Sequence, residues 1–131
     1  MQFSGYSAYK VAATTTTKSK KDLLLMLYDG ILACIRLAKK GMLQKHWATK
    51  GEQISKAVAI LGELDCALDY QAGGGMAANL ADLYRYAMIR LTHANLYNDL
   101  TMLTEVEQLL TELQRSEERR VGKECRSRWS P

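Results

Sequence analysis

The stretch from Asn79 to Asp99 carries apolar residues with the period of an α-helix, and it does so on two sides. At about 100° per residue, the first set has the spacing of a helix that packs on a protein core. This first set is Leu80, Leu83, Tyr84, Ala87, Leu91 and Ala94. A second set, on the side where a surface helix normally carries charges, is Tyr86, Ile89, His93 and Leu96. The helix must therefore either lie centrally in the fold or offer one face for another molecule to bury.

A further helix is predicted upstream, from Lys20 to about Gly41. Ser19 and Asp22 have the spacing of a capping box, and the apolar run begins directly after them. Its core stripe is Leu24, Leu27, Ile31, Cys34, Ile35 and Ala38. Because Gly30 costs about 1 kcal/mol in the middle of a helix compared with alanine, we expect another group to pack close to it.

Two more helices complete the predicted fold. One runs from Thr49 or Gly51 to Tyr70, and the run from Ala72 to Gly75 is expected to end it, since glycine tolerates the geometry of a helix terminus. Asp99 is the candidate N-cap of the last helix. The inner face of that helix is Leu103, Val106, Leu110 and Leu113. Short connections between four helices predict an all-α, antiparallel four-helix bundle over residues 19–115, and 131 residues suffice for one such domain.

The first eighteen residues form an arm with little helical pattern. Four consecutive threonines, from Thr14 to Thr17, favour an extended backbone. The arm also contains apolar residues, among them Phe3, Tyr6 and Tyr9, which a solvated tail does not need. Two interpretations stay open: a disordered terminus, or an extended strap that lies in an apolar groove of the bundle until a partner displaces it.

From Ser116 to Pro131 the composition changes, and the apolar period stops. We expect this segment to be an unrelated or disordered tail rather than part of the bundle. A basic interaction tail is the alternative interpretation.

The sequence offers little for catalysis or for cofactors. Its two histidines, His46 and His93, have no partners at metal-ligand spacing, and no nucleophile or phosphate-binding motif occurs. We therefore expect no enzyme, no metal and no cofactor.

The net charge of +4 is too small to indicate nucleic-acid binding, and no apolar run is long enough to insert into a membrane. Three cysteines without a CxxC pair favour a reducing compartment, so we expect a cytoplasmic protein.

Several segments together resemble one known family. They are the run LLLMLYDG from Leu23 to Gly30, the run SKAVAILGEL in the second helix, and the block NLADLYRYAMIRLTHAN followed by Asp99 and EVEQLL. Their order and spacing are similar to those of the flagellin-specific secretion chaperone family, FliS, over about Tyr9 to Leu113. The resemblance implies a cytoplasmic helical bundle that binds the C-terminal amphipathic helices of flagellin and prevents their polymerisation before export. It also implies the flagellar export gate as a candidate partner.

An export chaperone for an amphipathic helix must present apolar surface that its own core does not use, which the second stripe of the two-sided helix would supply. We therefore predict that Tyr9, Tyr86, Ile89, His93 and Leu96 bind the partner. A face of the first helix that includes Leu25 and Leu32 is the alternative client surface. A generic adaptor that binds another amphipathic helix, or a homodimer formed through the same stripe, is the alternative function.

Overall fold

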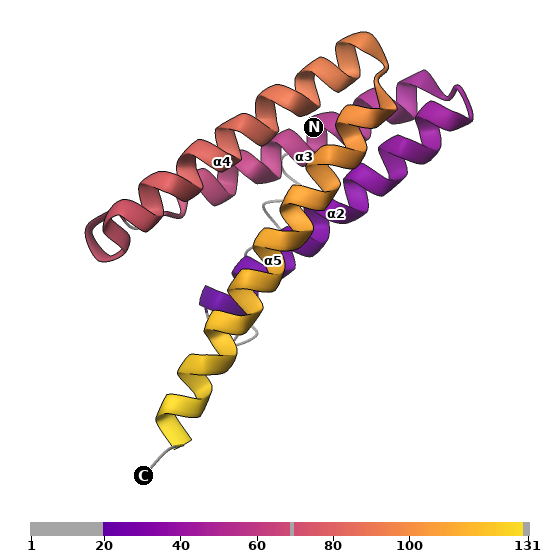
Figure 1. The fold of residues 1–131 in the computed structure, drawn as a ribbon. Helices are drawn as coiled ribbons and strands as arrows, with labels where there is room; N and C mark the ends of the chain where they lie inside the picture. Colours follow the sequence, from indigo (N-terminus) through magenta and orange to yellow (C-terminus); the bar gives the residue numbers. More distant parts are fainter. Residues whose placement is uncertain (1–19, 69, 130–131) are drawn as a thin grey trace.

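The computed structural model describes residues 20–68 and 70–129, and side chains within residues 22–68 and 75–119. This part of the chain forms four helices (Figure 1). They are α2 (Lys20–Leu43), α3 (Trp47–Cys66), α4 (Tyr70–Tyr97) and α5 (Leu100–Trp129). The predicted all-α bundle is therefore confirmed. None of these helices combines the length and the apolar character that a membrane span requires.

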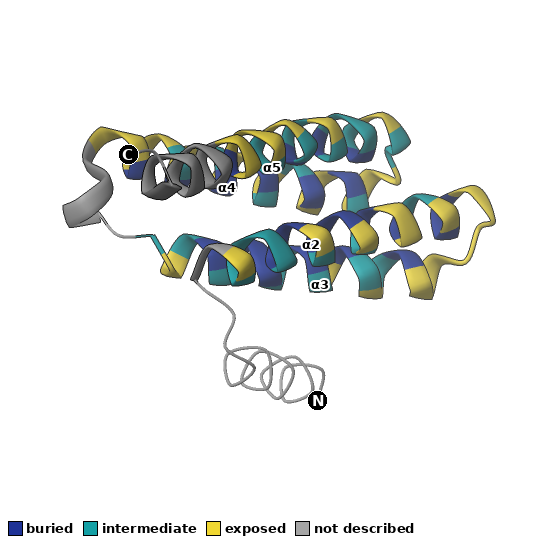
Figure 2. Ribbon diagram, turned by 90° about the horizontal axis from the view of Figure 1, so that it is seen from below, coloured by how far each residue is buried: buried dark blue, intermediate teal, exposed yellow. Residues whose placement is uncertain are grey.

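The helices pack in a closed ring, in which each contacts the next in the sequence and α5 contacts α2. Figure 2 shows two layers, α2 beside α3 and α4 beside α5, with buried residues between them. Because the connections are short, consecutive helices run in opposite directions. The turn between α2 and α3 and the turn between α4 and α5 consequently lie at the same end of the bundle (Figure 1).

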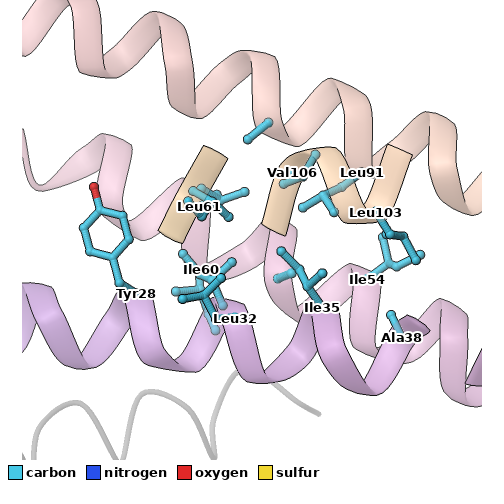
Figure 3. Packing of buried hydrophobic residues seen from close by; sticks show 14 of the residues in the cluster. Tyr28, Leu32, Ile35, Ala38, Ile54, Ile60, Leu61, Leu91, Leu103 and Val106 are labelled. Atoms are coloured by element: carbon cyan, nitrogen blue, oxygen red, sulfur yellow. The ribbon is translucent and has the colours of Figure 1, made fainter. Parts of the chain in front are cut away.

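The core contains side chains from all four helices, which point toward one another in Figure 3. Toward one side of the cluster, the hydroxyl groups of Tyr28 and Tyr84 lie 2.7 Å apart and share a hydrogen bond, so both polar groups are satisfied where water is excluded. The predicted close contact at Gly30 is also present, because Ile60 Cδ1 lies 3.5 Å from the position that a Cβ would occupy. Leu32 is buried in this core, so the alternative client face that included it is not available.

Ion pairs join α5 to α2 along one edge of the bundle. Glu107 of α5 accepts hydrogen bonds from Lys39 Nζ at 2.8 Å and from Arg36 Nε at 3.0 Å. Partial burial raises the pKa of the Glu107 carboxyl, but these two donors outweigh that effect and the pKa lies below its usual value. Farther along the same pair of helices, Gln114 donates to Asp29 at 2.6 Å.

Two helix boundaries differ from the sequence-based prediction. The second helix ends at Cys66 instead of Tyr70, and the glycine run from Gly73 to Gly75 lies inside the beginning of α4 instead of ending α3. The reason lies farther along α4, where Ala77 and Ala81 are buried and extend the core stripe toward the N-terminus. Burial of that stripe outweighs the low helix propensity of glycine.

The C-terminal boundary lies within a continuous helix. Asp99 caps α5, as predicted, because its Oδ1 accepts a hydrogen bond from the Met102 amide at 3.3 Å. The helix then continues past Ser116 to Trp129, so no break in secondary structure marks the start of the predicted tail.

Candidate functional site

The four predicted partner-binding residues of α4 lie together on its solvent side, and we call them the outer stripe: Tyr86, Ile89, His93 and Leu96. All are exposed, Ile89 by 56% and Leu96 by 68%. Tyr84, Ala87, Leu91 and Ala94, from the opposite side of the helix, are almost completely buried. The helix therefore packs on the core through one face only. Of the two arrangements that the sequence allowed, the structure has the one in which α4 presents a second apolar face to solvent.

A further exposed aromatic residue, Tyr97, lies beside the outer stripe at the C-terminal end of α4. The Tyr97 side chain is 68% exposed, and its ring meets the His93 ring edge-on, with centroids 6.1 Å apart. At about 100° per residue, Tyr97 falls close to Tyr86 and His93 on the helix. The sequence therefore contained a signal for the position of this residue, although the predicted set did not include it.

A polar cluster borders the stripe where α4 meets α5. The Tyr86 hydroxyl donates a hydrogen bond of 2.5 Å to one oxygen of Glu105, and Arg90 donates one of 2.8 Å to the other. The guanidinium carbon of Arg90 also lies 5.9 Å from the centre of the Tyr86 ring. These contacts fix the ring of Tyr86 at the edge of the stripe.

The same contacts change how these groups ionise. Hydrogen bonds from Tyr86 and then from Arg90 lower the pKa of the Glu105 carboxyl. The hydrogen bond to Glu105, with smaller contributions from burial and from the carboxylate charge, raises the pKa of the Tyr86 hydroxyl. At neutral pH the cluster therefore holds a carboxylate, a guanidinium and a neutral phenol, which is a stable structural arrangement.

A second polar contact, which the sequence did not indicate, joins α3 to the C-terminal end of α4. Lys50 is buried, and its ammonium group donates to the Asn95 carbonyl oxygen at 2.9 Å and to Asn98 Oδ1 at 2.6 Å. The same nitrogen lies 5.7 Å from the centre of the Trp47 ring. Because lysine is rarely buried, a pattern-based analysis places it at the surface.

Two further predictions concern the arm residue Tyr9 and metal binding. Tyr9 belongs to the arm and lies outside the described residues, so its predicted role stays a prediction. Elsewhere on the surface, Asp65 Oδ2 of α3 lies 3.8 Å from Arg85 Nε of α4, which is an ion pair between these two helices. Within the described part of the chain, no group of three histidine, cysteine, aspartate or glutamate residues is arranged to hold a metal ion. The described surface does have one exposed apolar face, on α4.

Comparison with known protein families identifies the type of chain to which this bundle is similar. Residues 2–116 match the family model described as flagellar protein FliS. The matched region includes all four residues of the outer stripe and ends where the composition of α5 changes.

Individual relatives agree with the family match. The flagellar secretion chaperone FliS of Salmonella typhimurium is 38% identical over 109 residues, which are 82% of this chain and 81% of that relative. FliSB of Pseudomonas aeruginosa is 36% identical over 82% of this chain and 86% of its own length. FliS of Bacillus subtilis is 32% identical, over 94% of this chain and 90% of its own length.

Proposed function

Because the chain belongs to the FliS family of flagellar secretion chaperones, we propose that it binds the C-terminal amphipathic helices of flagellin in the cytoplasm and prevents their premature polymerisation. A chaperone of this kind holds its client without catalysing a reaction. The client would leave it at the export gate of the flagellar secretion system.

The observation that carries this proposal is the outer stripe itself. The core of the bundle is filled by the inner face of α4 and by the other three helices, so folding does not need the outer stripe. A contiguous exposed apolar face of this length is a common feature of surfaces that bind an amphipathic helix. Burial of each large apolar side chain would contribute about 1.5 to 3 kcal/mol, so a few contacts would hold a client helix.

Substitution of Ile89 by aspartate tests the proposal, because it places a charge in the middle of the stripe and leaves the core unchanged. In the complex, the carboxylate would lose water without gaining a partner, so we expect the affinity for a flagellin C-terminal segment to fall roughly a hundredfold or more. The free bundle keeps this carboxylate in water and should melt within about 3 °C of the parent protein. Calorimetric titration and thermal unfolding of the same variant measure both quantities.

Leu37→Asp is the matched control, since Leu37 is similarly exposed, by 47%, but lies on α2, diagonally across the ring from α4. It should leave flagellin binding unchanged. Equal binding by the parent and by Ile89→Asp would rule out the outer stripe as the client surface. If Ile89→Asp instead converts a dimer into a monomer without affecting flagellin binding, the stripe is a self-association surface.

A further inference from the structure

The turn that joins α2 to α3 presents both positive charge and apolar surface, and we call five exposed residues in and beside it the basic turn: Lys40, Leu43, Lys45, His46 and Trp47. Leu43 is 68% exposed and Trp47 is 48% exposed. Between Asp29 and Glu52 the sequence contains no acidic residue. The turn therefore combines two exposed apolar side chains with a local excess of positive charge.

The acidic side chains around the basic turn do not neutralise its lysines. Glu107 pairs with Arg36 and Lys39, Glu52 pairs with Lys56 at 3.2 Å, and Asp99 caps α5. Among the described residues, no ion pair involves Lys40 or Lys45. Both ammonium groups are therefore available to a partner that carries negative charge.

The backbone of the turn is held in one conformation. The His46 amide donates to the Gly41 carbonyl oxygen at 2.7 Å, and the Lys50 amide donates to the His46 carbonyl oxygen at 3.0 Å. Lys45 has a φ of 59°, in the left-handed region where glycine or asparagine is the usual residue. A lysine in this position costs backbone energy, which makes its exposed side chain a candidate for function.

Trp47 is also held in place before any partner binds. The Lys50 ammonium group lies over its ring and is itself fixed by the Asn95 carbonyl oxygen and by Asn98 Oδ1. A tryptophan that is half exposed and already oriented loses little conformational freedom on binding. Tryptophan is also among the residues that most often dominate the binding energy of protein interfaces.

From these observations we infer that the basic turn docks an acidic protein segment in which carboxylates flank a large apolar side chain. The carboxylates would pair with Lys40 and Lys45, and the apolar side chain would pack on Leu43 and Trp47. This site uses α2 and α3, whereas the outer stripe lies on α4, so the inference does not depend on the proposed flagellin binding.

The partner is a protein segment and not a membrane surface, because the turn offers too little for stable membrane attachment. Lipid-binding basic clusters typically contain about four to eight lysines or arginines, and the basic turn has two unpaired lysines. Stable membrane attachment also needs a longer apolar face than two side chains provide.

Tryptophan fluorescence tests this inference on the full-length chain. The chain has two tryptophans, so Trp129→Phe leaves Trp47 as the only one and as a direct reporter of the turn. The probe is a short synthetic peptide in which glutamates flank a leucine and a phenylalanine, and its control has glutamine in place of each glutamate. We expect saturable binding of the acidic peptide that shifts Trp47 emission and weakens as salt is added, with much weaker binding of the glutamine peptide.

The variant Lys40→Gln/Lys45→Gln, in the same background, should bind the acidic peptide roughly three- to tenfold more weakly. Lys56→Gln, which removes one charge from α3 away from the turn, should bind like the parent. Ile89→Asp should also bind the peptide normally while losing the flagellin segment, which separates the two proposals. The inference is overturned if neither peptide binds, if the double variant binds as well as the parent, or if Trp47 responds only to vesicles of anionic phospholipid.

Discussion

At Gly41, even a methyl group would meet the backbone of the next helix. A Cβ there would lie 3.1 Å from the Lys50 amide nitrogen and 3.2 Å from the His46 carbonyl oxygen. Neither atom belongs to a side chain that could rotate away. Glycine at this position therefore allows the α2–α3 turn to close tightly, and it supports the conformation in which the turn presents its lysines.

Gly62, in the C-terminal part of α3, has the opposite surroundings, since no atom beyond its chain neighbours and its own helix backbone lies within 4 Å of the position of its missing Cβ. Gly41→Ala should thus destabilise the protein by about 1 to 3 kcal/mol, because the backbone must shift. Gly62→Ala should stabilise it by about 0.5 to 1 kcal/mol, because alanine is the better helix former. Urea unfolding of the two variants measures both effects. A Gly41→Ala variant as stable as the parent, or more stable, would show that close packing at Gly41 is unimportant.

The burial of Lys50 and its contacts could not be predicted from the sequence. A lysine at this position of α3 has no visible partner in the sequence, so the sequence pattern does not predict its burial. The partners are Asn95 and Asn98, which come close only once α3 and α4 pack in opposite directions. The exposed residues of α4 could be predicted because one helix determines their positions, whereas the Lys50 contact depends on two helices.

Among the elements, the boundary between α3 and α4 was the hardest to predict. Glycine-rich runs usually end helices, and this one was expected to do so. The buried alanines Ala77 and Ala81 could have indicated that the core stripe continues toward the glycines, but alanine is weakly apolar and carries little signal alone. In contrast, the large apolar residues of α5 predicted most of its inner face, with Leu103, Val106 and Leu110 all buried. In α2 the predicted stripe was incomplete, because Tyr28 and Leu32 are also buried.

The contact between α4 and α5 should depend on pH through Glu105. Hydrogen bonds from Tyr86 and Arg90 lower its pKa in the folded state. A carboxyl group whose pKa is lower in the folded protein than in the unfolded chain stabilises the fold at any pH above its pKa in the unfolded chain. This contribution is lost as the pH falls through the pKa of the folded state. Glu105→Gln should therefore lower the melting temperature most at neutral pH, with a difference that shrinks as the pH drops below the usual glutamate value of 4.5.

Thermal unfolding of both proteins over a series of pH values measures this difference. Glu112→Gln removes a charge from an exposed position of the same helix and controls for the change in net charge. A difference between the parent and Glu105→Gln that stays constant through the acid range would show that the carboxylate does not stabilise the helix contact.

For the whole molecule, α5 closes the ring, because it contacts both α2 and α4. A chain that ends at Asn98 lacks three fully buried side chains of the core, so we expect it to lose cooperative unfolding and to bind a hydrophobic dye. A chain that ends at Arg119 keeps every described core residue, and its free energy of unfolding should change by less than about 0.5 kcal/mol. Calorimetry and dye fluorescence compare the two, and a large loss of stability in the longer chain would show that the remaining part of α5 is needed for folding.

The closed ring also has a consequence for how the chain is made. A ribosome releases α2 first and α5 last, yet these two helices are neighbours in the finished bundle. Until α5 emerges, the apolar faces of α2 and α4 that it will cover have no partner, and the nascent chain exposes the kind of surface that promotes aggregation. A protein proposed to protect other unfinished chains thus passes through a vulnerable stage of its own during translation, which ends when its last helix docks.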